Sequence, residues 1–183
     1  MIKKIVELRH ALHQHPEVSN NEYKTSERIV NFMSELTPTK TLSLSKTGKA
    51  FVFEGAEPGK TIVFRAELDA LPITEKSSLS YASINQNVSH ACGHDGHMSI
   101  LTGLAQKIAN EPPKYGKVVI LFQPAEEVEQ GAKDVVEDPH FRALEPDYIF
   151  ALHNIPGIEK HNIVMKSSSF SAAGTIKGHS LQN

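Results

Sequence analysis

The chain has one cysteine among its 183 residues, so it cannot form an internal disulfide bond. Its longest uninterrupted apolar run, Val118 to Phe122, is far too short to span a bilayer. Acidic and basic residues nearly cancel, 21 against 19, and no long basic run is present, which argues against a nucleic-acid partner. Charged residues interrupt the N-terminal segment, so we expect no signal peptide. A single cysteine without an export signal predicts a reducing, cytoplasmic location.

Histidine is the residue present in unusual number, with ten in the chain and three of them between positions 90 and 97. The stretch SHACGHDGH, residues 89–97, puts Cys92 among imidazoles and a carboxylate. These side chains are soft and borderline ligands for a divalent transition metal. A Cys-x-His pair alone is more typical of core packing. The flanking His90, Asp95 and His97 favour a metal site, because two glycines let the chain turn tightly and the side chains converge.

Apolar periodicity predicts helices that alternate with strands along the chain. The helices are expected over 3–14, from a capping box at 19–22 to about 36, over 98–109 and over 131–137. The strands are expected over 40–45, 50–54, 61–64, 117–122 and 148–152, with turns at Gly48 and at 56–59. The last three strands are continuous apolar runs, typical of strands covered on both faces. We therefore predict an α/β three-layer sandwich with a largely parallel, open, twisted sheet.

Polar residues follow three of the predicted strands at the point where each strand ends. They are Arg65 to Asp69, Gln123 to Glu127, and His153 with Asn154. In open α/β sheets, ligands gather outside the carboxyl ends of the strands, so we expect these residues to lie together. No internal repeat or low-complexity linker is visible, and the serine-rich stretch 167–171 is the only candidate boundary.

The adjacent pair Glu126 and Glu127 has two interpretations. Paired glutamates are common on solvated helix faces and at helix N-termini. This pair, however, comes directly after a buried strand and a proline. Adjacent side chains point in different directions, so one carboxylate can bind a metal while the other faces a water, as hydrolysis requires. His153, taken alone, could equally be an ordinary strand-end histidine.

Five motifs occur in order along the chain: LHQHPE (12–17), RAELDALPI (65–73), HACGHDGHM (90–98), FQPAEE (122–127) and FALHN (150–154). Together they closely resemble the M20 metallopeptidase family. The resemblance is greatest to its amidohydrolase branch, which includes N-acyl-amino-acid deacylases, hippurate hydrolases, auxin-conjugate hydrolases and N-acetyldiaminopimelate deacetylases. It runs from about residue 5 to 173, and HACGHDGH followed by QPAEE is highly specific in combination.

The resemblance implies a site for two divalent metal ions, zinc or manganese first and cobalt or nickel as alternatives. The ligands would be Cys92, His94, Glu127 and His153, with Cys92 as a candidate bridge between the ions. Glu126 would be the general base that activates a water and later protonates the leaving amine. Asp69 would orient the ligands. Glu67 stands where this branch usually has Asp, and its longer side chain could shift that geometry. His90 and His97 would surround the ligands, and His10, His13 and His15 would pack or cap near the site.

The resemblance also implies a longer protein. Family members continue past residue 183 with a dimerising α+β lid and a last histidine ligand. We therefore expect residues 1–173 to be a partial catalytic domain and 174–183 to be a remnant of the lid start or a tail. His179 is a candidate for the lid histidine that reaches a partner's site, although its spacing differs. The sheet would keep an exposed edge that favours self-association, and turnover would be weak or absent.

Three functions stay open on the sequence. The first is metal-dependent hydrolysis of the amide bond of N-acylated amino acids or similar small amides. The second is a metal-binding fragment without turnover. The third is a thiol enzyme with Cys92 as nucleophile, which leaves Glu126, Glu127 and His153 unexplained. A small N-acyl amino acid or peptide-like molecule is the expected partner. We expect neither nucleic acid nor membrane, and a homodimer only through a lid that is missing here.

Overall fold

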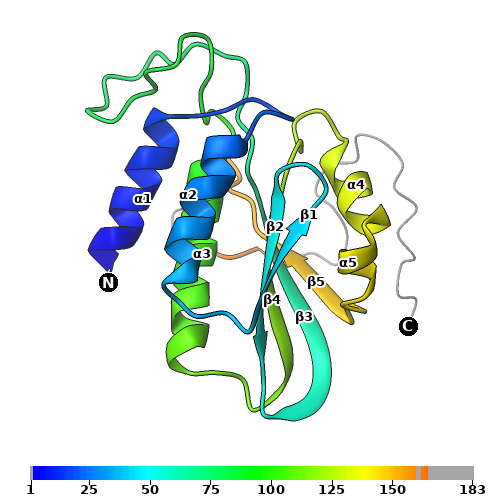
Figure 1. Cartoon of the computed structure of the whole chain (residues 1–183). Coiled ribbons are helices and arrows are strands. Elements are labelled where there is room, and N and C mark those ends of the chain that lie inside the picture. Colours follow the sequence, from blue (N-terminus) through cyan, green and yellow to red (C-terminus); the bar gives the residue numbers. More distant parts are fainter. Residues whose placement is uncertain (1, 160–161, 165–183) are drawn as a thin grey trace. The chain divides into compact units, whose positions relative to one another are not determined.

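A mixed sheet of five strands, in the order β1-β2-β4-β3-β5, organises the chain (Figure 1). The computed structural model describes residues 2–159 and 162–164. Its strands are β1 (Lys40–Leu44), β2 (Gly48–Glu54), β3 (Glu57–Glu67), β4 (Tyr115–Gln123) and β5 (Tyr148–Ala151). β3 runs parallel to both β4 and β5, whereas β1 and β2 pair antiparallel. The α/β prediction is confirmed, but the parallel part is limited to the three strands that precede the polar clusters.

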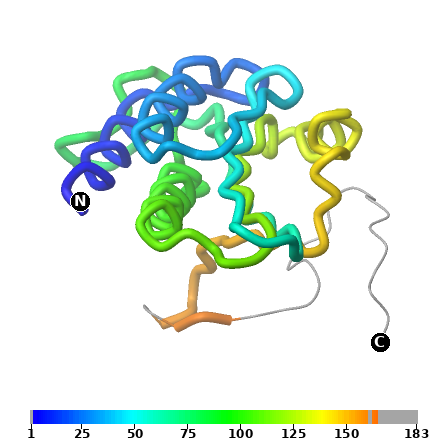
Figure 2. The backbone as a smooth tube through the Cα atoms, turned by 60° about the horizontal axis from the view of Figure 1, so that its bottom comes forward, coloured from blue at the N-terminus to red at the C-terminus, as the bar shows by residue number. Residues whose placement is uncertain are grey.

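Helices cover both faces of this sheet. α1 (Ile2–Gln14), α2 (Tyr23–Ser34) and α3 (His94–Asn110) lie on one face, and α4 (Gly131–Glu137) and α5 (Pro139–Arg142) lie on the other (Figures 1 and 2). Successive strand residues point to opposite faces. The core on the α1–α3 side includes Phe51, Phe53, Ile120 and Phe122, and the core on the α4–α5 side includes Ala50, Val52, Val119 and Leu121. This alternation produces the expected three layers.

Phe51 and Phe122 connect β2 to β4 in the larger core. Both are fully buried, and their rings meet edge to face with centroids 5.9 Å apart. Such a pair adds about 0.5–1.5 kcal/mol to the effect of burial alone. Because β4 ends at Gln123, this packing also fixes where the chain enters the Pro124–Glu127 turn.

The start of α3 differs from the prediction, which placed it at Met98. The helix begins at His94, after Gly93 adopts a left-handed conformation with φ 94° at the N-cap. Its first turn holds His94, Asp95 and His97, all at most 2% exposed. Apolar periodicity missed this turn because its buried positions are polar.

Two local predictions in the first sixty residues are wrong. The predicted turn at 56–59 is the start of β3, because Glu57 pairs with Tyr115 and a register irregularity between Glu57 and Thr61 accommodates Pro58. The predicted capping box does not form, since α2 begins only at Tyr23. The carboxylate of Glu17 caps this helix instead, accepting hydrogen bonds from the Thr25 amide at 2.7 Å and the Lys24 amide at 3.3 Å.

β5 forms one edge of the sheet within the described residues. Its Tyr148, Ile149 and Phe150 are about half exposed, although the Phe150 ring stacks on Phe64. Residues up to His153 form one compact unit, which ends before Asn154. No helix among the described residues is long and apolar enough to cross a membrane. The predicted boundary at 173/174, the serine stretch 167–171 and His179 lie outside the described residues.

Candidate metal centre

His94 is at the centre of the predicted site. It lies on the first turn of α3, is 1% exposed, and its Nδ1 is 2.8 Å from the backbone carbonyl oxygen of Asp69. A carbonyl oxygen can only accept, so Nδ1 carries the proton and Nε2 presents a lone pair. This Nε2 is buried and has no hydrogen-bond partner among the described residues. Leaving a buried polar atom unpaired costs about 1–3 kcal/mol. A metal ion on Nε2 would remove that penalty.

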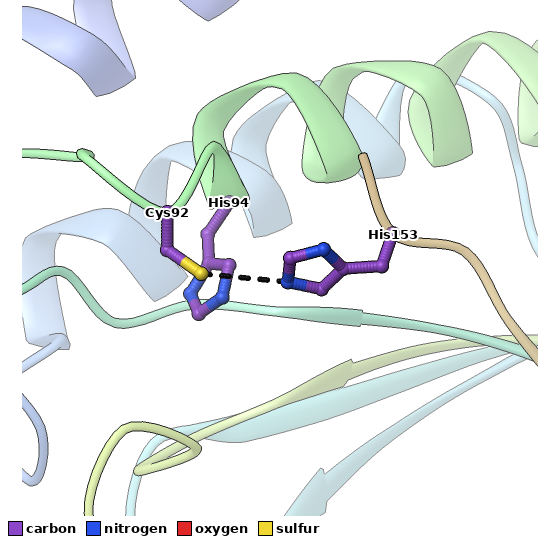
Figure 3. Close-up of side chains that lie close together, drawn as sticks. All are labelled: Cys92, His94 and His153. Atoms are coloured by element: carbon purple, nitrogen blue, oxygen red, sulfur yellow. Dashed lines mark hydrogen bonds between the residues drawn. The ribbon is translucent and has the colours of Figure 1, made fainter. Parts of the chain in front are cut away.

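The other predicted ligands lie around His94. Cys92 comes just before α3 and His153 comes after β5, and Cys92 Sγ lies 3.4 Å from His153 Nε2 (Figure 3). His94 Nε2 is 3.8 Å from Glu127 Oε1 and 3.8 Å from Glu126 Oε2. Two ligands bound tetrahedrally to one zinc ion lie about 3.3–3.8 Å apart, given bonds of about 2.0–2.3 Å, so these separations match a shared ion.

Two overlapping groups of potential ligands therefore share His94. The ligand atoms of Cys92, His94 and His153 lie within 4.8 Å of one another, as do those of His94, Glu126 and Glu127. The sheet explains part of this convergence, because β4 and β5 both run parallel to β3 and bring Glu126, Glu127 and His153 to one edge. Cys92 and His94 come to the same edge at the start of α3. The four predicted ligands and Glu126 are thus brought together, and the donors suit zinc and related divalent ions.

Asp69 forms hydrogen bonds with both His94 and Glu127. Its side chain is fully buried, and Oδ2 accepts hydrogen bonds from Ser19 Oγ at 2.6 Å and from the Glu127 amide at 2.9 Å. Its carbonyl oxygen accepts the hydrogen bond from His94 Nδ1. Asp69 therefore fixes the backbone of Glu127 and the ring of His94 at the same time.

The charges around Cys92 affect its ionisation. Burial, together with the negative charges of Glu127, Glu126 and Glu67, raises the pKa of the Cys92 thiol to about 12. Burial also raises the pKa of Glu127, with the charges of Glu126 and Asp69 in the same direction. A nucleophilic cysteine needs a lowered pKa and electropositive surroundings. This environment opposes the thiol-enzyme interpretation and suits a cation, which deprotonates a coordinating thiol outright.

Glu67 and His97 form a third potential group with His94. Glu67 Oε2 is 2.8 Å from His97 Nδ1, and Glu67 Oε1 is 2.7 Å from Arg65 Nη1. Burial opposes ionisation of Glu67, but the bond to His97 and the charge of Arg65 outweigh it and lower the Glu67 pKa. Its charge is therefore already compensated by protein groups. Glu67 and His97 thus lie beside His94.

The other histidines among the described residues belong to none of these potential ligand groups. His90 is buried, and burial lowers its pKa to about 4. His10 stacks on Tyr81 at a centroid distance of 3.8 Å.

His13 lies between two carboxylates, with Nδ1 3.0 Å from Asp95 Oδ2 and Nε2 3.0 Å from Glu75 Oε1. Because ionised carboxylates only accept, both ring nitrogens donate and His13 is charged. Burial opposes this charge, but the bonds to Glu75 and Asp95 raise the His13 pKa. The helix α1 is thereby tied to the segment after β3 and to the first turn of α3.

Sequence reasoning missed two residues that support the site, Ser19 and Glu22. Ser19 donates to Asp69, and Glu22 accepts from the Ala125 amide at 2.8 Å. Their signal was present in the motif SNNE (19–22), which was interpreted as a helix cap. Only the folded chain reveals that these side chains bond across to the ends of β3 and β4.

Comparison with known proteins identifies the family of the chain. The sequence profile of the peptidase family M20/M25/M40 matches residues 63–173. The N-acetyldiaminopimelate deacetylase of Listeria innocua is 39% identical over 168 residues, which are 91% of this chain and 45% of that protein. The enzyme of the same name from Oceanobacillus iheyensis is 37% identical over 169 residues, again with 45% of its length covered. The chain thus spans somewhat under half the length of these curated relatives.

Two solved structures are similar in both fold and sequence. A Bacillus subtilis protein described as a dinuclear metal-binding peptidase of the M20 family superimposes with a TM-score of 0.78 at 36% identity, covering 85% of this chain and 43% of that one. A putative aminohydrolase from methicillin-resistant Staphylococcus aureus gives a TM-score of 0.76 at 39% identity, covering 82% and 40% of the two chains.

Proposed function

The chain belongs to peptidase family M20/M25/M40, and from this premise we propose that it carries the metal site of a hydrolase that cleaves amide bonds in small N-acylated amino acids. The observation that carries the proposal is the buried, unpaired Nε2 of His94 with thiol, imidazole and carboxylate donors around it. The Bacillus subtilis relative described as a dinuclear metal-binding peptidase supports two ions rather than one.

The residues that would hold the ions are Cys92, His94, Glu127 and His153. Burial raises the pKa of both Cys92 and Glu127 in the protein alone, and the negative charge of Glu127 raises the pKa of Cys92 further. Divalent ions bound there would supply a water of lowered pKa and would polarise a carbonyl oxygen. Zinc and manganese are the first candidates, because the donors include one thiolate, two imidazoles and a carboxylate.

Glu126 is proposed to move the proton. Its side chain is 35% exposed, more than the 16% of Glu127, so it faces the open side of the site. Its carboxylate takes a proton from the attacking water while the oxygen bonds to the acyl carbon. When the carbon–nitrogen bond breaks, Glu126 returns this proton to the leaving amine. Asp69 holds the Glu127 amide and the His94 ring throughout and exchanges no proton.

The acylated substrate is proposed from the relatives. Proteins named N-acetyldiaminopimelate deacetylase are 37–40% identical to this chain over most of its length. An N-acetyl amino acid is therefore the first substrate to test. The single free thiol at this site also fits a reducing cytoplasm, where it would stay available to a metal.

The test separates metal binding from turnover. Metal-free protein is titrated with zinc and with manganese by calorimetry, and amine release from N-acetyl amino acids is then measured for wild type, Glu126→Gln and His94→Ala. We expect Glu126→Gln to bind metal as wild type does and to release no amine, and His94→Ala to lose binding. Metal binding without amine release by wild type would support the metal-binding fragment instead. Wild type that binds no divalent metal would refute the proposal.

A further inference from the structure

The buried carboxylate of Glu22 lies where three separate segments meet. Glu22 is fully buried at the start of α2. Its Oε1 accepts from the Asn20 amide at 2.9 Å and from the Ala125 amide at 2.8 Å, and its Oε2 accepts from Thr47 Oγ1 at 2.9 Å. The charged group is thus satisfied by three donors, as a buried charge requires. One of these donors belongs to the residue directly before Glu126.

The backbone at Ala125 needs this support. Its φ is 47°, in the left-handed region that residues with a Cβ adopt at a cost of about 1–2 kcal/mol. Its carbonyl oxygen accepts from the Gly131 amide at 3.0 Å and the Gln130 amide at 3.2 Å, so the peptide groups on both sides of Ala125 are held. The unusual conformation reverses the chain after β4 and turns Glu126 and Glu127 toward His94.

The segment that contains Glu22 crosses the ends of two strands. Its first part pairs with the chain beyond β3, where Val18 bridges to Ala70 and the Ala70 amide donates to the Glu17 carbonyl. Ser19 then bonds to Asp69. At the end of this segment, Glu22 accepts a hydrogen bond from the amide of Ala125, which lies just beyond β4. Residues 17–22 therefore link the two strand ends that supply Asp69 and the glutamate pair.

We propose that Glu22 is a positioning residue for the metal site: its Oε1 fixes the Ala125 amide and so sets the place of Glu126 and Glu127. This inference rests on the proposed function, since it concerns the same metal site. Glu22 contacts neither ion nor substrate, and acts only through the Ala125 peptide. Residues that support ligands in this way typically change metal affinity about 10–100-fold when they are removed.

The chain offers matched variants for the test. Glu22→Ala removes the acceptor for Ala125. Glu22→Gln keeps an oxygen at Oε1 for both amides, and its new amide group can donate to the Thr47 hydroxyl. Thr47→Val removes a bond to the same carboxylate and leaves the Ala125 bond in place. Zinc affinity is measured by competition with a chromophoric chelator, and circular dichroism and Tm report folding.

We expect Glu22→Ala to weaken zinc binding about 10–100-fold, and Glu22→Gln and Thr47→Val to stay within about threefold of wild type. Folded Glu22→Ala with wild-type zinc affinity would overturn the proposal. Equal losses of affinity in Glu22→Ala and Thr47→Val would also overturn it, because the role would then be general packing.

A second variant covers the case in which the first does not fold. If Glu22→Ala is unfolded, Glu22→Asp decides instead, since it keeps the charge and withdraws the carboxylate by one methylene. We expect it to lose zinc affinity, and wild-type affinity would overturn the inference. Failure of the proposed function is distinguishable, because in that case the wild-type chain itself binds no zinc.

Discussion

Replacing Gly131 by alanine should displace the turn that carries the glutamate pair. A Cβ at Gly131 would lie 1.6 Å from the Pro124 carbonyl oxygen and 2.6 Å from its carbonyl carbon, both backbone atoms. Real Cβ atoms stay beyond 3.0 Å, so the start of α4 and the Pro124–Glu127 turn must separate by about 1.4 Å. Sites of this kind tolerate misplacements of only about 0.5 Å.

Two quantities should therefore fall in Gly131→Ala. Overpacking of this size lowers the free energy of unfolding by about 1–3 kcal/mol or more. The shift of Glu127 should weaken metal binding about 10–100-fold, as loss of supporting contacts does elsewhere. Urea unfolding reports the first quantity, and zinc competition titration reports the second.

Gly96→Ala is the matched control. Gly96 lies in the first turn of α3, between His94 and His97, yet a Cβ there would meet nothing closer than Arg9 Nε at 3.9 Å. Alanine is favoured over glycine inside helices by about 0.5–1 kcal/mol, so this variant should be as stable as wild type or more so. Its zinc affinity should not change. If Gly131→Ala matches Gly96→Ala in both stability and affinity, the steric reasoning is refuted.

Three further predictions concern the core, the thiol and the α1 contact. Phe122→Ala should lower the free energy of unfolding by about 3–5 kcal/mol in urea, and a loss under 1 kcal/mol would contradict the packing described at β4. Because the pKa of Cys92 is raised to about 12 without metal, zinc binding near neutral pH should release a proton from the thiol. Calorimetry in buffers of different ionisation enthalpy measures this release, which should disappear in Cys92→Ala. Because the pKa of His13 is raised in the folded protein, protonated His13 stabilises the fold. This contribution to the free energy of unfolding is fully present below about pH 6.5 and is lost as the pH rises through the folded-state pKa of His13. Tm should therefore fall across that range in wild type, and the slope should flatten in His13→Gln.

Strand ends, a local signal, predicted that some of the site residues lie together, whereas Cys92 and His94 came from the histidine-rich stretch 89–97. Glu127 and His153 each follow an apolar run, and parallel strands bring such positions to one edge of the sheet. This reasoning does not predict how the strands pair. The sheet was expected to be largely parallel, but β1 pairs antiparallel with β2, and β2 pairs antiparallel with β4.

Predictions failed where a polar side chain forms a hydrogen bond with a residue far away in the sequence. The motif SNNE has the spacing of a helix cap, but Ser19 bonds to Asp69 and Glu22 bonds to Ala125, fifty and about a hundred positions away. The first turn of α3 was missed for the same reason, because its buried histidines bond to polar groups far along the chain. His97 bonds to Glu67 at the end of β3, and His94 bonds to the carbonyl oxygen of Asp69 just beyond it. Local sequence patterns predict which apolar side chains are buried. They do not predict which polar side chains are buried by hydrogen bonds to distant residues.

X-ray absorption spectroscopy of the zinc-loaded chain tests the ligand set most directly. We expect a sulfur shell at about 2.3 Å from zinc together with nitrogen and oxygen at about 2.0–2.1 Å. The sulfur shell should vanish in Cys92→Ser, and the nitrogen contribution should fall in His94→Ala. A wild-type spectrum with nitrogen and oxygen scatterers alone would contradict the convergence of Cys92 and His94 on a shared metal.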